Sequence, residues 1–240
     1  MTETEIRQIL KQRLEAVNKR IDAACHRAAR ASDEVLLVAV TKTVDSSVAE
    51  MLADLGVKDM GESRPQELWR KAAEVGRPVN WHLIGHLQRN KIERTLPCVH
   101  LIHSVDSLRL LEALEADATK QTEPLPILLE VNASLEAQKH GFSVEEVSEL
   151  IPHLGRLKHV QVRGMMTMAA LTDDAESARS PFRRLRELRD ELAKNVPAPH
   201  ELQELSMGMS SDFEVAIEEG ATMIRVGSIL FEGLPGKSHG

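Results

Sequence analysis

Short apolar runs alternate with longer, more polar segments along most of the chain. Residues 35–41 read Val-Leu-Leu-Val-Ala-Val-Thr, contain no charge and are rich in β-branched side chains. Such a run is too short for an isolated buried helix and is typical of a strand buried on both faces, as in parallel sheets. Residues 3–30 instead place Ile6, Leu10 and Leu14 at helical spacing among charged residues, which predicts an amphipathic helix.

Eight strands alternate with helices when the whole chain is divided in this way. The expected strands are residues 35–41, 57–61, 80–85, 99–103, 127–132, 160–166, 201–206 and 223–227. The expected helices are residues 3–30, 46–55, 65–75, 88–95, 106–120, 143–153, 175–195 and 211–219. This alternation predicts a parallel α/β sheet with right-handed crossovers. Eight units favour a single (β/α)8 TIM-type barrel over an open doubly wound sheet. We expect one domain, residues 1–240, with residues 1–30 as an extra N-terminal helix packed on the barrel.

Local signals predict where several of these elements begin. Asp106 is expected to cap the helix that follows it. Ser-x-x-Glu capping boxes that start at Ser143 and Ser211 predict two more helix starts. The sequence Glu-Pro-Leu-Pro at residues 123–126 predicts a break in regular structure before the fifth strand.

Composition and charge narrow the range of partners. The net charge is −7, and no basic stripe with interleaved aromatic residues is present, so nucleic acid is not an expected partner. Cys25 and Cys98 give neither a disulfide framework nor metal-ligand spacing, which suits a reducing cytoplasm. The acidic N-terminus is unlike a signal peptide, and no apolar run approaches the length of a membrane span. We therefore expect a cytoplasmic protein without a metal or a membrane partner.

Lys42 directly follows the first apolar strand. In a parallel barrel this is the carboxyl-terminal end of the strand, the edge at which catalytic groups collect. A lysine that is partly desolvated there has a lowered pKa, and its neutral amine can form a Schiff base with a carbonyl. The alternative is a lysine that merely extends past the strand end into solvent.

Small hydroxyl residues and glycines follow the last two strands. Ser206-Met-Gly-Met-Ser210-Ser-Asp follows the seventh strand, and Gly227-Ser228 follows the eighth. Backbone N–H groups and hydroxyls at these positions predict a phosphate site, which barrels often form after strands seven and eight. Ordinary turn and capping chemistry is the alternative.

Arg225 lies within the eighth strand between two apolar residues. A buried arginine is costly unless it has a partner. The candidates are a carboxylate such as Glu62 or Glu130, or an acceptor on a bound ligand.

Several stretches occur together in an order that resembles one known family. They are Thr41-Lys-Thr43, Gly61-Glu-Ser-Arg-Pro-Gln-Glu67, Trp81-His-Leu-Ile-Gly-His-Leu-Gln-Arg-Asn-Lys91, Ser206-Met-Gly-Met-Ser-Ser-Asp212 and Met223-Ile-Arg-Val-Gly-Ser228. The set resembles the pyridoxal phosphate homeostasis protein family, the single-domain relatives of the alanine racemase barrel, over roughly residues 30 to 233.

The resemblance implies a pyridoxal 5′-phosphate site with specific roles. The lysine that matches Lys42 forms the internal aldimine in that family. The serine that matches Ser210 binds the phosphate together with the turn that matches Gly227-Ser228. The arginine that matches Arg225 faces the pyridine nitrogen and keeps it unprotonated, since two positive groups in contact repel.

Four further residues are expected at the same site. The family usually has asparagine where this chain has Ser63, so a shorter hydroxyl takes the place of the amide. We also expect His82 to line the pocket, Met166 to pack against the cofactor and Ser206 to contribute from the end of its strand.

Three candidate functions are consistent with these residues. The first is a carrier that holds pyridoxal phosphate on Lys42 for intracellular homeostasis without substantial turnover, as a monomer that supplies pyridoxal phosphate-dependent apoenzymes. The second is an amino acid racemase of the alanine racemase type, which needs a second acid–base group opposite the lysine. In alanine racemases that group is a tyrosine, and this chain has none, so the carrier is favoured. The third is a cofactor-free, lysine-dependent aldolase.

Overall fold

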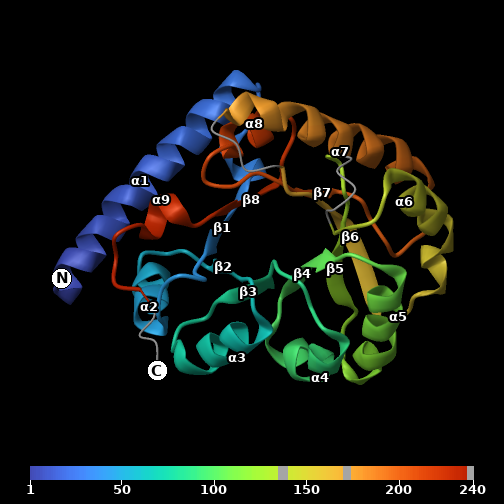
Figure 1. The fold of residues 1–240 in the computed structure, drawn as a ribbon, viewed down its shortest axis with the longest axis horizontal. Coiled ribbons are helices and arrows are strands. Elements are labelled where there is room, and N and C mark those ends of the chain that lie inside the picture. Colours follow the sequence, from blue (N-terminus) through green and yellow to red (C-terminus); the bar gives the residue numbers. More distant parts are fainter. Residues whose placement is uncertain (135–139, 170–173, 237–240) are drawn as a thin grey trace.

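Eight parallel strands close into a barrel in the order β1 to β8, as the sequence predicts (Figure 1). The structure is a computed structural model that describes residues 1–134, 140–169 and 174–236. The strands are β1 (Leu36–Val40), β2 (Asp59–Glu62), β3 (Asn80–Leu83), β4 (Leu101–Val105), β5 (Leu125–Glu130), β6 (Val160–Met166), β7 (Glu204–Ser206) and β8 (Met223–Val226).

Helices surround the barrel on its outer side. They are α1 (Glu3–Arg27), α2 (Ser46–Asp54), α3 (Pro65–Glu74), α4 (Ile92–Thr95), α5 (Leu108–Asp117), α6 (Val144–Leu150), α7 (Arg179–Leu192), α8 (Phe213–Glu218) and α9 (Ser228–Phe231). The short helix α9, directly after the last strand, is absent from the prediction. Among the described residues, no helix combines the length and the apolar character that crossing a membrane requires.

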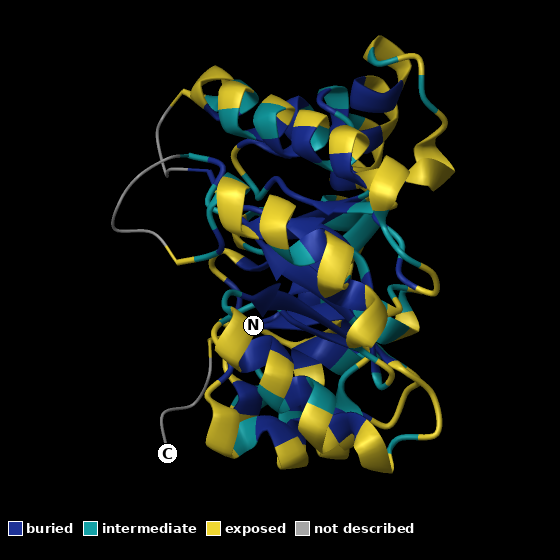
Figure 2. Cartoon of the chain, turned by 90° about the vertical axis from the view of Figure 1, so that its right-hand side faces the viewer, coloured by how far each residue is buried: buried dark blue, intermediate teal, exposed yellow. Residues whose placement is uncertain are grey.

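Burial follows the amphipathic pattern of the elements. Buried residues lie on the strands and on the inward faces of the helices, and exposed residues cover the outer faces (Figure 2). One large apolar cluster fills the space between strands and helices. A second, smaller cluster is formed by Leu101, Leu128, Met166 and Met223.

The predicted N-terminal helix is confirmed as α1, which packs against α8 and α9 at the other end of the sequence. Ile6, Leu10 and Val17 are among its buried residues. Arg20 pairs with Glu214, with N–O distances of 2.7 and 2.8 Å. This helix therefore covers the part of the barrel wall where the last elements of the chain lie.

Pro126 lies inside β5 rather than in a break before it. Pairing of β5 with β4 begins only at Ile127, so the missing N–H of Pro126 costs no hydrogen bond on that side. On the other side, Leu125 donates its N–H to His159 at 2.8 Å. The predicted break at residues 123–126 is therefore wrong in its second half.

Two of the expected helix starts also differ from the prediction. The N-cap residue of α5 is Ser107, because the carboxylate of Asp106 instead bonds His86 at 2.9 Å. The helix α8 begins at Phe213 with Asp212 at its N-cap, so the capping box expected at Ser211 is not formed. The box at Ser143 is confirmed.

Candidate functional site

The ends of β1 and β8 bring Lys42 close to the turn that follows β8. The register pairs Val38 with Arg225 and places Val40 beside Gly227. A Cβ atom on Gly227 would lie 3.1 Å from the carbonyl oxygen of Val40, so a side chain at this position would require the two backbones to move apart by a few tenths of an ångström. Lys42 follows in a turn and is exposed. The expectation that it is partly desolvated is therefore wrong, because the turn carries it beyond the strand end.

A buried ion pair lies beside this strand end. Lys71 Nζ donates to Glu62 Oε1 at 2.6 Å and to the carbonyl oxygen of Thr41 at 2.7 Å. The hydroxyl of Thr41 donates to the same carboxylate oxygen at 2.7 Å. All three residues are fully buried. Glu62 is thus the partner of Lys71, and its assignment as a partner of Arg225 is wrong.

The loop after β7 and the turn after β8 are joined by direct hydrogen bonds. Ser210 Oγ accepts the N–H of Gly227 at 3.1 Å, and the carbonyl of Gly208 accepts the N–H of Arg225 at 3.0 Å. Gly208 has a φ of 90°, a conformation that L side chains rarely adopt. Asp212 closes the loop by accepting the N–H of Met209 at 2.6 Å. The two regions that the sequence assigns to phosphate therefore lie side by side.

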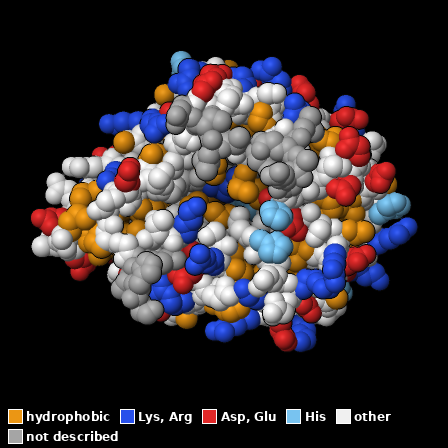
Figure 3. Space-filling view, viewed as in Figure 1, with side chains coloured by type: hydrophobic (Ala, Val, Ile, Leu, Met, Phe, Trp, Pro, Cys, Tyr) orange, Lys and Arg blue, Asp and Glu red, His pale blue; other side chains and the backbone are white. Residues whose placement is uncertain are grey.

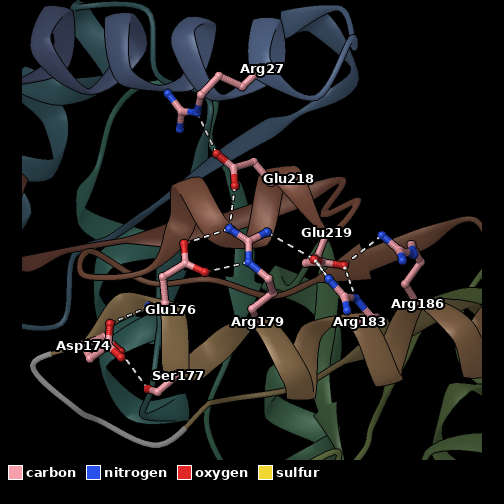
Figure 4. A network of polar contacts seen from close by, with 9 residues as sticks. All are labelled: Arg27, Asp174, Glu176, Ser177, Arg179, Arg183, Arg186, Glu218 and Glu219. Atoms are coloured by element: carbon pink, nitrogen blue, oxygen red, sulfur yellow. Dashed lines mark hydrogen bonds and ion pairs between the residues drawn. The ribbon is translucent and has the colours of Figure 1, made fainter.

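The helix α8, which follows this loop, is held by a network of arginines and glutamates (Figure 4). Glu219, at the end of α8, pairs with Arg179, Arg183 and Arg186 of α7 at 3.1, 3.0 and 2.9 Å. The Glu219 side chain is only 4% exposed. Burial raises the pKa of Glu219, but the arginine contacts outweigh it and hold the pKa below its usual value.

Arg225 is buried in the barrel and is held by neutral oxygen atoms. It donates to Ser206 Oγ at 2.6 Å and to the carbonyl of Thr167 at 2.9 Å. Burial lowers its pKa to about 10, against the opposing charges of Glu130 and Asp212. In the described part of the chain it forms no ion pair, so its positive charge is not neutralised by direct contact with a carboxylate.

Two residues that sequence reasoning missed, Asp59 and His103, join His82 to this group. His82 is buried and bonds Asp59 at 3.0 Å and His103 at 2.8 Å. His103 bonds Ser206 at 2.8 Å. His82 therefore lies two hydrogen bonds away from Ser206, deeper than the sequence suggests. The only feature of the sequence that points to His103 is its position as a polar residue inside a largely apolar strand.

The other expected site residues occupy different depths. Met166 is buried in the small apolar cluster, and Ser63 is half-buried in the loop after β2. The loop of Ser63 packs tightly on the next one, since a Cβ on Gly85 would collide with the carbonyl of Ser63. Ser228 is exposed at the start of α9.

Histidines gather near the centre of the face seen in Figure 3, beside lysine and arginine side chains. The rings of His86 and His140 are 6.1 Å apart, and His86 also bonds Asp106. Burial and the charge of Asp106 raise the pKa of the nearby Glu130. No group of three metal-ligating side chains occurs among residues 1–134, 140–169 and 174–236.

A cavity with a volume of about 740 Å³ lies elsewhere, between α5 and α6. Leu108, Leu111, Phe142 and Leu150 contribute its apolar lining, and Asp106, which bonds His86, also lines it. Lys42, Ser210 and Arg225 do not line it.

Comparison with known proteins relates the chain to one group of relatives. A profile of the family described as "Alanine racemase, N-terminal domain" matches residues 13–235. The pyridoxal phosphate homeostasis protein of Aquifex aeolicus is 42% identical over 223 residues, which cover 92% of this chain and 96% of that protein.

Solved structures extend the likeness to three dimensions. PipY of Synechococcus elongatus, solved with pyridoxal phosphate bound, is 32% identical with a TM-score of 0.80, over 92% of this chain and 99% of that chain. An alanine racemase of Clostridium difficile shares the fold at 19% identity and a TM-score of 0.73. That match covers 95% of this chain but 57% of the racemase chain.

Proposed function

Because the chain belongs to the pyridoxal phosphate homeostasis protein family, we propose that it binds pyridoxal 5′-phosphate at the carboxyl-terminal edge of its barrel. We further propose that it holds this cofactor for pyridoxal phosphate-dependent apoenzymes, without substantial turnover and as a monomer. The relative with bound cofactor and the geometry at the ends of β1, β7 and β8 support the proposal.

The phosphate is assigned to the loops after β7 and β8. Ser210 Oγ already accepts the N–H of Gly227, so its own hydrogen is free to be donated to an anion. The first N–H groups of a helix have no partner within it, so the start of α9 at Ser228 offers further donors. The bond from Ser210 to Gly227, which joins these two strand ends, is the observation that carries the proposal.

Lys42 and Arg225 are assigned to the two other functional parts of the cofactor. When bound, pyridoxal phosphate supplies an aldehyde, to which an amine can attach, and an electron-accepting ring. Lys42 is exposed at the end of the strand that neighbours β8, so its amine has room to reach the aldehyde. Arg225 contacts no carboxylate among the residues that the structure describes and can donate to the ring nitrogen, which keeps that nitrogen unprotonated.

Absorption spectroscopy with chemical trapping tests the assignment of Lys42. Purified protein supplied with pyridoxal phosphate should gain the absorption band of a covalent lysine linkage, and borohydride reduction should fix the label on Lys42. Lys42→Ala should lose the band while staying folded. Lys58→Ala, at the opposite end of the barrel, should keep it. A label that maps to Lys58 or Lys91 would contradict the assignment, and a protein without any band would favour the cofactor-free aldolase.

Solvent deuterium exchange separates the carrier from the racemase. Racemisation needs acid–base groups on both faces of the substrate, and this chain contains no tyrosine to serve opposite Lys42. We expect negligible exchange of the α-proton of L-alanine in deuterated water. Exchange at about one turnover per second or faster, within the ordinary range of enzymes, and its loss in Lys42→Ala, would overturn the carrier function.

A further inference from the structure

Five buried or half-buried side chains form one continuous hydrogen-bonded chain through the interior of the barrel. Arg225 bonds Ser206 at 2.6 Å, Ser206 bonds His103 at 2.8 Å, His103 bonds His82 at 2.8 Å and His82 bonds Asp59 at 3.0 Å. The residues come from β8, β7, β4, β3 and β2. Because β4 and β7 are not neighbours in the barrel, the bond from His103 to Ser206 crosses its interior.

One set of bond directions, starting at the arginine, satisfies every group in this chain. A guanidinium only donates, so Ser206 Oγ accepts from Arg225, and donating its single hydrogen to Nδ1 of His103 satisfies both side chains. Nδ1 of His103 is then unprotonated, and Nε2–H donates to Nδ1 of His82. His82 in turn donates Nε2–H to the carboxylate of Asp59. In this arrangement both histidines are the neutral Nε2–H tautomer.

The surroundings of the chain favour this arrangement. Burial, with the charge of Arg225, holds the pKa of His103 well below its usual value, so the ring stays neutral. Burial raises the pKa of Asp59, but hydrogen bonds from His82 and Asn80 lower it by more. The pKa therefore lies below its usual value, and the carboxylate stays ionised. The Asp59 side chain is 15% exposed, and His82 and His103 are almost fully buried.

We propose that Ser206, His103, His82 and Asp59 are positioning residues that fix the orientation of the Arg225 guanidinium toward the cofactor-binding end of the barrel. This inference rests on the proposed function for the role of Arg225. Each bond polarises the next, so the carboxylate of Asp59 makes Ser206 a stronger acceptor for the guanidinium. The negative charge of Asp59 thus stabilises the buried positive charge of Arg225 without contacting it.

Protonation of His103 would break the chain. An added proton on Nδ1 would make His103 a donor to Ser206, which would then accept from both sides and lack an acceptor for its own hydrogen. The titratable and charged groups that face His103 are His82, His100 and Arg225. Acidification should therefore loosen Arg225 only when His103 itself takes up a proton.

The first test needs no cofactor. In ¹⁵N-correlated NMR spectra of the cofactor-free protein, His82 and His103 should both show a protonated Nε2 and an unprotonated Nδ1 at neutral pH. A protonated Nδ1 on His103 would overturn the inference. This result is independent of cofactor binding, so it distinguishes failure of the chain from failure of the proposed function.

The second test uses pyridoxal phosphate as the probe and three variants. His103→Leu removes both bonds of the ring and should weaken binding by roughly tenfold, as for one lost hydrogen bond to a charged group. His103→Gln can still accept from Ser206 and donate to His82, so it should restore most of the affinity. His100→Leu is the matched control, since the His100 ring packs 5.7 Å from that of His82 without joining the chain.

The absorbance of the bound cofactor as a function of pH supplies a readout that a loss of packing alone would not move. The wild type and His100→Leu should share one pH profile, and the profile of His103→Leu should be shifted. His103→Gln should match the wild type at neutral pH and lack the change that protonation of His103 causes in acid. Circular dichroism establishes that each variant is folded. Equal affinities and equal pH profiles for folded His103→Leu and His100→Leu would overturn the proposal.

Discussion

Lys71 and Glu62 form a fully buried ion pair that also holds the carbonyl of Thr41, the residue before Lys42. Both charges lie out of contact with water, and Glu62 Oε2 has no hydrogen-bond partner in the described residues. A buried pair of this kind adds little net stability, but removing one partner leaves the other charge buried alone.

Replacing Lys71 should therefore be strongly destabilising. Lys71→Met should lower the free energy of unfolding by about 3–5 kcal/mol, because the charge of Glu62 loses its partner. Urea unfolding monitored by circular dichroism measures the change. The double variant Lys71→Met with Glu62→Leu should recover most of the loss, and a double variant as unstable as the single one would show that the effect is packing and not charge.

Ser210 offers a test of the phosphate assignment at a single atom. Ser210→Ala removes a donor to a charged group, which contributes about 1.5–3 kcal/mol, so affinity for pyridoxal phosphate should fall roughly ten- to a hundredfold. Affinity for pyridoxal, which has no phosphate, should change little. Titration of both ligands measures the effect, with the exposed neighbour variant Ser211→Ala as control. Equal losses for the two ligands would place Ser210 away from the phosphate.

The residues that sequence reasoning identified differ from those it missed in where their partners lie. Lys42, Ser210 and Gly227 lie in the loops that follow β1, β7 and β8, so position in a local pattern is sufficient to select them. His103 is defined by contacts with Ser206, which is 103 residues away in sequence. No local pattern contains such a pairing, and it exists only once the barrel closes.

At the scale of elements, α8 depends on its neighbours more than on its own sequence. It spans six residues, too short for an isolated helix to be stable. Arg27 of α1 and Arg179 of α7 both pair with Glu218 at 2.7 Å, and three arginines pair with Glu219 (Figure 4). The sequence predicts this helix but not the residue at which it begins. The capping box expected at Ser211 does not form, because the next residue, Asp212, is the N-cap, and its carboxylate accepts the N–H of Met209 in the preceding loop.

The lowered pKa of Glu219 makes the contribution of this network depend on pH. A carboxylate with a lower pKa in the folded state than in the unfolded state stabilises the fold above the unfolded value of about 4.3. That stabilisation is lost as pH falls through the folded pKa. Glu219→Gln should thus be less stable than wild type by a constant margin above about pH 5 and by a shrinking margin below it.

Urea unfolding of both proteins between pH 7 and 3 measures this margin. Glu187→Gln is the control, since Glu187 is exposed on α7, and its margin should stay near zero throughout. A Glu219→Gln margin that grows on acidification would contradict the assigned direction of the pKa shift.

At the scale of the whole molecule, the eight-unit pattern was sufficient to predict a closed barrel. The strands are largely buried and each is followed by a covering segment, so the order of strands follows the order of the chain. Closure joins Leu36 to Thr222 by a hydrogen bond of 2.8 Å. It also brings the two predicted halves of the site, after β1 and after β7 and β8, to one edge.

Cofactor binding at a site shared by the first and last strands should stabilise the whole barrel. A ligand that binds only the folded state at about 100 times its dissociation constant adds about 2.7 kcal/mol to the free energy of unfolding. We expect that gain with pyridoxal phosphate, and a smaller gain for Lys42→Ala at the same concentration. Thermal or urea unfolding measures both. An identical gain for Lys42→Ala and wild type would show that the lysine adds nothing to affinity.

The packing of α1 on α8 and α9 has a consequence for the order of events during protein synthesis. The apolar face of α1 leaves the ribosome before α8 and α9, the part of its cover that is made about 200 residues later. At a synthesis rate of about 5–20 residues per second, the apolar face of α1 stays without this cover for roughly 10–40 s. Nascent chains stalled after residue 200 should be cleaved within α1 by a protease, whereas chains stalled after a linker beyond residue 240 should resist. Equal resistance at both lengths would mean that packing on α2 already protects α1 before α8 and α9 are made.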